Sequence, residues 1–264
     1  MKKIFSLLLV ILMVSGCGGG KETKNNTESV KHKRILIVGI DDKFAPMGFR
    51  NEAGEIVGFD VDLAKEAARR MGVEIEFCPI EWNNKEYEIT SGNIDMIWNG
   101  CDITEEYKKY MIFSKPYMEN RQILLVKSGN RQNIVSEHDL ADKKVGTQSG
   151  SNSEAYINKN QKLKDNLSAF KTYPNIKEAF DALNGGEIDV LIVDEIAGRY
   201  EISKHPGTFE IIEVTLGPIT QFGIAFPKGN TALRDKVQTV FDQMIKDGTA
   251  KKISEEWFKA DLIK

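Results

Sequence analysis

The chain has few of the residues from which metal centres and disulfide frameworks are built. Its 264 residues include three Cys and three His, and no Cys/His cluster has metal-ligand spacing. We therefore expect no metal and no cofactor. An excess of one charge is missing too, because 36 basic and 39 acidic residues give a net charge of −3 without a basic tract in the body of the chain. This balance argues against a nucleic-acid partner.

Long hydrophobic runs are also missing, and one short run stands at the start of the chain. Lys2 and Lys3 come before an apolar run over residues 4–14, which ends in small residues and Cys17. This pattern is typical of a secretory signal, whereas a membrane span needs roughly 20 apolar residues. The Cys resembles the lipobox of bacterial lipoproteins, which implies a signal peptide at 1–16 and lipid, such as palmitate, on the Cys17 thiol. The alternative is a plain signal peptide with an incidental Cys.

The segment after Cys17 is polar and has no apolar periodicity. Residues 17–33 are therefore predicted to be the lipidated Cys and a solvated tether. The predicted location is the extracytoplasmic face of a bacterial cell membrane, with the protein held there by its lipid anchor. Cys78 and Cys101 each end an apolar run; in an exported protein they could pair, but buried free thiols are the interpretation we favour.

From residue 34 onward, short apolar runs alternate with helical patterns. The first half predicts strands at 35–38, 73–77 and 94–98, with a helix at 60–71 that ends at Gly72. The second half repeats this order, with strands at 144–147, 169–173 and 188–193 and helices at 151–158 and 176–183. Strands separated by helices favour parallel sheets flanked by helices, so the fold class is α/β.

A short sequence echo links the two halves. Residues 91–97 (Ser-Gly-Asn-Ile-Asp-Met-Ile) match residues 185–191 (Gly-Gly-Glu-Ile-Asp-Val-Leu). In both segments a helix is predicted to end at Gly and a buried strand to begin with Ile-Asp. Two similar Rossmann-like lobes explain the echo, and chance similarity of two βα units is the alternative.

A strand-like stretch at 122–126 lies between the two halves, and another at 221–226 comes after the second half and after Gly217-Pro218. Helices are predicted at about 231–246 and 249–258. Two crossover strands would return the last helices to the first lobe. The predicted lobes are residues 34–121 with 222–264, and residues 122–221, with hinge strands near 122–126 and 218–224.

This order of elements, with several motifs, resembles the family 3 extracellular solute-binding proteins, which have the type II periplasmic-binding-protein fold and serve as amino-acid receptors of ABC importers. The resemblance covers residues 34–260 and rests on segments 39–49, 58–64 (Gly-Phe-Asp-Val-Asp-Leu-Ala), 102–106, 113–117, 194–195, 221–225 and 257–258. It implies a monomeric receptor that closes over a small amine-bearing ligand and delivers it to a membrane permease.

In such α/β folds the ligand lies beyond the carboxyl ends of the strands. By family position, Phe44 would stack on the ligand and Asp41 would contact a polar end of it. Trp82 resembles the second pocket aromatic, and Asp194 matches the residue that binds the α-ammonium. The alternatives are core packing for Phe44, a loop cap for Asp41 and lobe packing for Trp82.

The loop that begins at Asn99 and Gly100 departs from the family pattern. The family has an Arg that clamps the ligand α-carboxylate with two hydrogen bonds, but Tyr107 stands at that position. Asp102 stands where Ser or Thr is usual. Three explanations stay open: the ligand lacks a carboxylate there, the ligand is more cationic than usual, or Asp102 points away and backbone amides bind the carboxylate.

The first helix of the second lobe offers another place for an anion. Gln148, Ser151 and Asn152 lie at its start, where free backbone N–H groups can hold a carboxylate. Ser151 and Glu154 have capping-box spacing, so a plain helix cap is the alternative. Together Asp41, Asp102 and Asp194 predict an acidic cleft that favours a cationic ligand.

Other functions were weighed against transport. A cleft dehydratase would need a positioned acid or base, and no Ser/His/Asp, Cys/His or paired acid–base set is evident, so we expect no enzyme. A receptor for a non-amino-acid amine and a sensory or surface lipoprotein remain alternatives.

Overall fold

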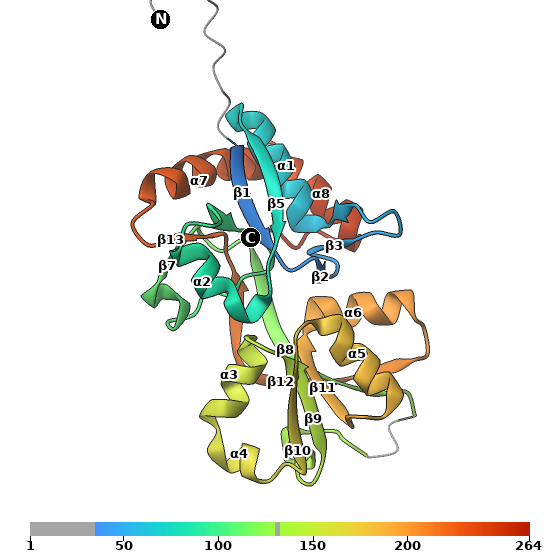
Figure 1. Ribbon diagram of the computed structural model, residues 1–264. Helices are drawn as coiled ribbons and strands as arrows, with labels where there is room; N and C mark the ends of the chain where they lie inside the picture. Colours follow the sequence, from blue (N-terminus) through green and yellow to red (C-terminus); the bar gives the residue numbers. More distant parts are fainter. Residues whose placement is uncertain (1–34, 130–132) are drawn as a thin grey trace, which may run out of the picture. The chain divides into compact units, whose positions relative to one another are not determined.

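The structure is a computed structural model that describes residues 35–129 and 133–264 (Figure 1). The predicted signal peptide, Cys17 and tether lie outside these residues and stay predictions. No helix within the described ranges is long and apolar enough to cross a membrane. The fold class is confirmed: the described chain forms two α/β lobes, each built around a five-stranded sheet.

The first sheet has the strand order β5-β1-β6-β13-β7. β1 is parallel to β5 and β6, while β13 is antiparallel to β6 and β7. Three helices, α1, α7 and α8, pack against one another in this lobe. The elements of the lobe are β1 (Ile35–Ile40), α1 (Phe59–Met71), β5 (Glu74–Pro79), the 3₁₀ turn η1 (Trp82–Asn84), α2 (Lys85–Thr90), β6 (Met96–Ile97), the turn η2 (Tyr107–Lys109), β7 (Met111–Phe113), β13 (Ala225–Pro227), α7 (Thr231–Lys246) and α8 (Thr249–Phe258), with a small sheet of β2 (Lys43–Phe44), β3 (Gly48–Arg50) and β4 (Ile56–Val57).

The second sheet has the order β10-β9-β11-β8-β12. β9 is parallel to β10 and β11, whereas β8 is antiparallel to both β11 and β12. The elements are β8 (Met118–Lys127), the turn η3 (Glu137–Leu140), β9 (Lys144–Gln148), α3 (Asn152–Lys159), α4 (Gln161–Asp165), β10 (Ala169–Tyr173), α5 (Ile176–Gly185), β11 (Val190–Asp194), α6 (Glu195–Lys204) and β12 (Phe209–Phe222).

The sequence echo marks equivalent positions in the two sheets. Asp95 accepts a hydrogen bond from the backbone N–H of Ile37 in β1 and returns one from its own N–H to the Ile37 carbonyl. Asp189 makes the same two bonds with Lys144 in β9. In both lobes this pair of bonds ties the segment before a buried strand to the parallel strand beside it. The echo therefore marks the same local structure in both lobes, as expected for two similar lobes.

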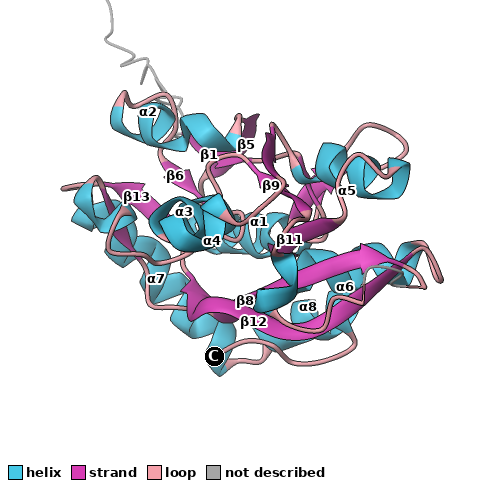
Figure 2. Cartoon of the chain, turned by 90° about the horizontal axis from the view of Figure 1, so that it is seen from below, coloured by secondary structure: helices cyan, strands magenta, loops and turns pink. Residues whose placement is uncertain are grey.

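The return strand differs from the prediction. We expected a strand at 221–226 that began after Gly217-Pro218, but β12 is one long strand that contains both residues. It lies beside β8 along most of its length (Figure 2). β12 is the edge strand of its sheet, and its register shifts between Ile212 and Leu216 and again between Leu216 and Thr220. Proline is tolerated at sheet edges and irregularities because it removes a donor that such positions do not need.

Other boundaries shift by a few residues. The strand predicted at 94–98 is paired only at Met96–Ile97, and β8 begins at Met118 rather than at Gln122. The helix predicted at 60–71 is confirmed, and Gly72 ends it in the left-handed conformation with φ of 66°. Sequence reasoning missed the short elements α2, β7 and α6 and the small sheet, because each is too short or too polar to show a clear period.

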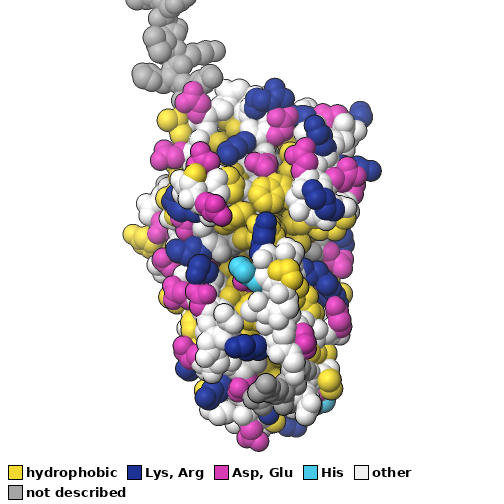
Figure 3. Space-filling model, turned by 90° about the vertical axis from the view of Figure 1, so that its right-hand side faces the viewer, with side chains coloured by type: hydrophobic (Ala, Val, Ile, Leu, Met, Phe, Trp, Pro, Cys, Tyr) yellow, Lys and Arg dark blue, Asp and Glu magenta, His cyan; other side chains and the backbone are white. Residues whose placement is uncertain are grey.

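The core extends through the first lobe into the second. Trp98 and Phe222 are fully buried in it, and the ring of Trp98 meets that of Phe241 edge-on at a centroid distance of 5.7 Å. On the surface, charges of both signs are interspersed over the face in Figure 3, as the small net charge implies.

Candidate functional site

One small cavity brings most of the predicted site residues together. Its volume is about 20 Å³, which is enough for about one water molecule. An amino acid therefore cannot enter while the walls stand as they do here. The residues that line it, all of them predicted from the sequence, are Phe44, Trp82, Gly100, Asp102, Tyr107, Gln148, Ser151, Asn152 and Asp194.

Hydrogen bonds that join the two lobes hold this cavity closed. Nε2 of Gln148, at the end of β9, donates to Oδ2 of Asp41 over 2.6 Å. The carbonyl of Gly150 accepts from two groups of the first lobe, Nζ of Lys85 at 2.7 Å and the hydroxyl of Tyr107 at 3.0 Å. Separation of the lobes would break these bonds and open the cavity to a ligand.

Asp41 and Asn99 do not line the cavity. Both carboxylate oxygens of Asp41 are occupied, one by the Lys43 N–H two residues on and the other by Gln148. The side chain of Asn99 accepts the N–H of Asp41 and is fully buried. The loop-cap alternative for Asp41 thus fits the structure better than a ligand contact. Burial raises its pKa, and the hydrogen bonds from Gln148 and Lys43 partly offset this.

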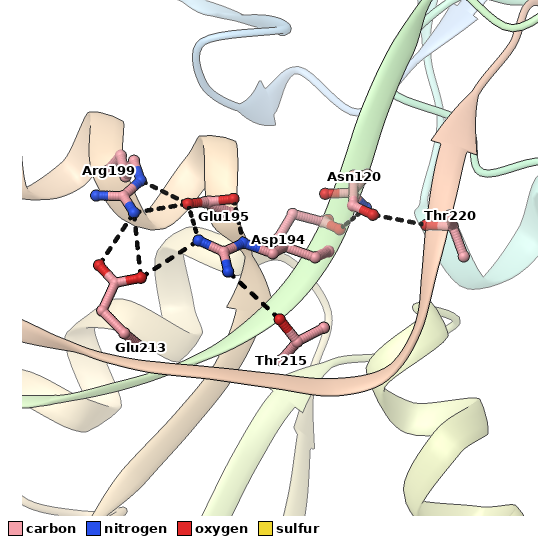
Figure 4. Close-up of polar contacts among 8 residues, drawn as sticks. Asn120, Asp194, Glu195, Arg199, Glu213, Thr215 and Thr220 are labelled. Carbon is pink, nitrogen blue, oxygen red and sulfur yellow. Dashed lines mark hydrogen bonds and ion pairs between the residues drawn. The ribbon is translucent and has the colours of Figure 1, made fainter. Parts of the chain in front are cut away.

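Asp194 and Glu195 are neighbours with different surroundings (Figure 4). Asp194 ends β11, and its Oδ1 accepts from Asn120 and, over 2.5 Å, from Gln122, both on β8. Glu195 opens α6 and forms ion pairs with Arg121 and Arg199. The Glu195 side chain therefore has different partners from that of Asp194.

Asp102 reaches the same group of residues from the first lobe. It is 7% exposed, and its Oδ1 accepts from Nδ2 of Asn120 at 3.1 Å and from the hydroxyl of Thr220. Its backbone forms a bridge with Phe222, where β12 ends. Asp102 and Asp194 both line the cavity and accept from the same amide, an arrangement that favours the first two explanations over the one in which Asp102 points away.

The start of α3 is only partly the predicted capping box. The Ser151 hydroxyl accepts the N–H of Glu154, as expected, but the Glu154 carboxylate accepts from Gly150 rather than from Ser151. Nδ2 of Asn152 is buried without a hydrogen-bond partner beside the cavity. An unpaired buried donor costs free energy, so Asn152 offers an anionic ligand group a donor that the protein itself leaves unused.

Lys85, a cation that the sequence analysis did not identify, lies against the two aromatic residues Trp82 and Tyr107. Nζ of Lys85 lies 5.0 Å from the ring centroid of Trp82 and 4.6 Å from that of Tyr107. Its side chain is 4% exposed, and burial lowers its pKa to about 8, although Cys101, Glu154 and Asp102 act in the opposite direction. Lys85 thus brings a positive charge to the ring of Tyr107, which stands where the family has Arg.

We expect the Lys85→Met variant to change how stability depends on pH. An exposed Lys titrates near 10.4, so between pH 8 and 10.4 the unfolded wild type binds more protons than the folded protein. Its unfolding free energy should then rise with pH, relative to the variant, by up to about 3 kcal/mol. Urea unfolding across this range measures the difference, with the exposed Lys108→Met as the control. A difference that stays constant would contradict the lowered pKa.

Several residues that hold the site together carried little sequence signal. Asn120 and Gln122 alternate on one face of β8, and Thr220 is opposite Asn120 on β12. Ser153 completes the group by donating to Oε1 of Gln122. Two buried polar residues at alternate positions before an apolar strand were the available clue. It was missed because the strand was predicted to begin at Gln122.

Other features of the described residues do not suggest a different chemistry. No group of three or more His, Cys, Asp or Glu within residues 35–129 and 133–264 is placed to hold a metal ion. Cys101 is a buried free thiol, as favoured, whereas Cys78 is a free thiol that is only half-buried. A larger hollow of about 570 Å³ lies elsewhere, against Phe49, Phe180 and Tyr200.

Comparison with known proteins identifies the group to which the chain belongs. The description "Bacterial extracellular solute-binding proteins, family 3" matches residues 36–260. The chain is a member of this family. The resemblance drawn from the motifs is therefore confirmed.

Similar proteins are binding proteins for amino acids. The L-cystine-binding protein TcyJ of Escherichia coli is 33% identical over 89% of this chain and 86% of its own length. A histidine-bound substrate-binding protein of an ABC uptake transporter from Streptococcus pneumoniae is 32% identical with a TM-score of 0.82. The match covers 87% of this chain and 94% of that one. An ancestral arginine-binding protein bound to arginine is 39% identical with a TM-score of 0.80. The match covers 86% of this chain and 100% of that one. All three are described as binding proteins.

Proposed function

We propose that this solute-binding protein is a lipid-anchored receptor that takes up an amino acid or a related amine between its two lobes and delivers it to an ABC importer. The observation that carries the proposal is the meeting of Asp102, Asp194 and two aromatic residues, Trp82 and Tyr107, around one cavity. These residues come from loops at strand ends of both sheets. The relatives described above bind cystine, histidine and arginine, which share an α-ammonium and an α-carboxylate.

The residues divide between the two ends of such a ligand. Asp194 and Asp102 bind the ammonium or a cationic side chain, because carboxylates stabilise a partly buried cation. The ligand carboxylate binds at the start of α3, where Asn152 has an unpaired donor and the helix N-terminus favours negative charge. This arrangement explains how a carboxylate is held although Tyr107 replaces the Arg.

Binding would proceed by opening and closure of the lobes. The cavity is too small for a ligand until the bonds from Lys85 and Tyr107 to Gly150 break. A ligand that contacts both lobes stabilises the closed state, since only a difference in affinity between two states shifts their populations. β8 and β12 connect the lobes and are the hinge segments of this motion. The importer would recognise the closed form.

A ligand screen by thermal unfolding tests the proposal. The panel contains the common amino acids, L-cystine, polyamines, short peptides, sugars and dicarboxylates, added to the purified chain. A ligand that binds only the folded state raises the melting temperature by mass action. We expect the increase from amino-bearing compounds. A response confined to sugars or dicarboxylates would contradict the assignment of Asp194.

Lipidation predicts a separate result. Cys17→Ser should abolish incorporation of radiolabelled palmitate and move the protein from the membrane fraction to the soluble fraction of bacterial cells, because the thioether attachment point is lost. Cys78→Ser is the matched control and should leave both unchanged. Palmitate labelling that survives Cys17→Ser would refute the lipid anchor but leave ligand binding untouched.

A further inference from the structure

Asp102 and Asp194 come from different lobes and share a single hydrogen-bond donor. Nδ2 of Asn120 lies between them and donates to Oδ1 of both. An amide nitrogen has two hydrogens, one for each carboxyl group. Figure 4 shows Asn120 between Asp194 and Thr220, the residue whose hydroxyl donates to Asp102.

The second oxygen of each carboxyl group is left free. Within the part of the chain that the structure describes, no hydrogen bond reaches Oδ2 of Asp102 or of Asp194, and neither residue forms an ion pair. Both side chains line the cavity. The other titratable or charged groups that interact with Asp102 are Lys85 of α2, Tyr107 of η2 and Cys101. Lys85 is the one cation among these, and its Nζ donates to backbone carbonyls.

Two carboxylates in such surroundings resist simultaneous ionisation. Burial raises the pKa of both groups, and the charge of Asp194 raises that of Asp102 further. Hydrogen bonds from Thr220, Asn120 and Gln122 offset this in part. Two interacting acids then lose their protons in two steps that belong to the pair. The second proton is therefore lost from the pair closer to neutral pH than from an ordinary carboxyl group.

We propose that Asp102 and Asp194 together hold one proton at neutral pH, and that an ammonium or guanidinium group of the ligand binds at their two free oxygens by displacing this proton into solvent. The proposal rests on the proposed function and specifies the class of ligand that the site binds. The resemblance implies that the family usually has Ser or Thr at the position of Asp102, so this chain carries one more carboxyl group there. A second carboxyl group adapts the site to a ligand with more positive charge than a simple zwitterion.

Proton displacement makes affinity depend on pH in a defined direction. Below the upper titration of the pair, each bound cation releases about one proton, so its affinity should rise up to about tenfold per pH unit. Above that titration the dependence should vanish. A site built on an ionised carboxylate alone would show no such slope near neutral pH.

The test begins with the full chain without ligand. Carboxyl ¹³C NMR of the protein labelled at Asp should show a group that titrates near neutral pH and is lost in both Asp102→Asn and Asp194→Asn. Absence of such a group from the wild type would overturn the proposal. This measurement does not depend on which compound the protein binds.

Calorimetry then measures proton release with L-arginine and L-lysine, whose own groups do not titrate near neutral pH. Titrations in two buffers of different ionisation enthalpy should give about one proton released by the wild type at neutral pH. We expect proton release to fall to near zero in both Asp102→Asn and Asp102→Ser. Two variants are used in case one of them misfolds. Glu195→Gln is the control and should keep the release.

The outcomes separate the two proposals. If L-glutamine or L-cystine binds without proton release and the cationic amino acids do not bind, the receptor function stands and the proton-sharing pair is refuted as a cation site. If the cationic compounds bind with no pH slope, the displacement is refuted. If no amino compound binds although the NMR titration is present, the receptor function is refuted. The shared proton is then supported, but its displacement by a cation is refuted.

Discussion

Asp194→Asn is expected to reduce ligand affinity by at least about a hundredfold. Removing one partner of a buried charged pair costs about 3–5 kcal/mol, and each 1.4 kcal/mol is a factor of ten in affinity. Oδ1 of the new amide would still accept from Asn120 and Gln122. Its NH2 group would replace the free Oδ2 and face the cationic group of the ligand. The measurement is a calorimetric titration with the compound that gives the largest shift in the thermal screen.

The control is the adjacent residue. Glu195→Gln removes the same charge one position along the chain, but its side chain belongs to the ion pairs with Arg121 and Arg199. It should change affinity less than about threefold, as expected for partly exposed ion pairs. Equal losses in the two variants would mean that general acidity of the region, rather than contact by Asp194, determines binding. A wild-type affinity in Asp194→Asn would remove Asp194 from the site.

Gly58→Ala is expected to be the most destabilising substitution of a single methyl group. Gly58 has φ of 147° and ψ of 168°, a conformation that is almost restricted to Gly. A Cβ there would lie 2.3 Å from the carbonyl oxygen of Met47. That carbonyl accepts the N–H of Asp60, and the neighbouring carbonyl of Pro46 accepts that of Phe59. The clash would separate the start of α1 from the loop that carries Phe44.

The expected loss in unfolding free energy is about 3 kcal/mol or more. For a chain of this size each kcal/mol lowers the melting temperature by about 2–4 °C. Gly54→Ala is the matched control, because Gly54 has φ of 80° but no heavy atom within 4 Å of its would-be Cβ. It should cost about 1 kcal/mol. Similar losses in both variants would show that backbone strain, and not the clash, is the main effect.

The motif Gly58-Phe59-Asp60 is therefore structural. Oδ2 of Asp60 accepts from the Gly100 N–H at 2.7 Å and from the Tyr117 hydroxyl at 2.8 Å. Burial raises the pKa of Asp60 to about 7, with both hydrogen bonds acting in the opposite direction. The motif hydrogen-bonds both to the loop that follows Phe44 and to the loop of Gly100. A recognisable sequence signature here fixes the walls of the site without contacting the cavity.

The sequence by itself determined the fold class and named the residues that meet around the cavity. Apolar periodicity gave the main strands and helices, and the Ile-Asp echo at Asp95 and Asp189 revealed the repeated unit. Loops at the ends of parallel strands meet at one edge of a sheet, so residues of such loops converge whatever lies between them in the sequence. The residues that line the cavity were predicted for this reason, and the family resemblance supplied their positions.

Tertiary structure alone decided how the charges are compensated. The sequence grouped Asp41 with Asp102 and Asp194, but the structure gives both oxygens of Asp41 to Gln148 and Lys43 and leaves the other two sharing Asn120. It also placed Lys85 between Trp82 and Tyr107. Hydrogen-bond partners and buried charges depend on atoms brought together across lobes within a few ångströms. No local pattern encodes such distances, because the energy of a buried polar group is set by its neighbours in space.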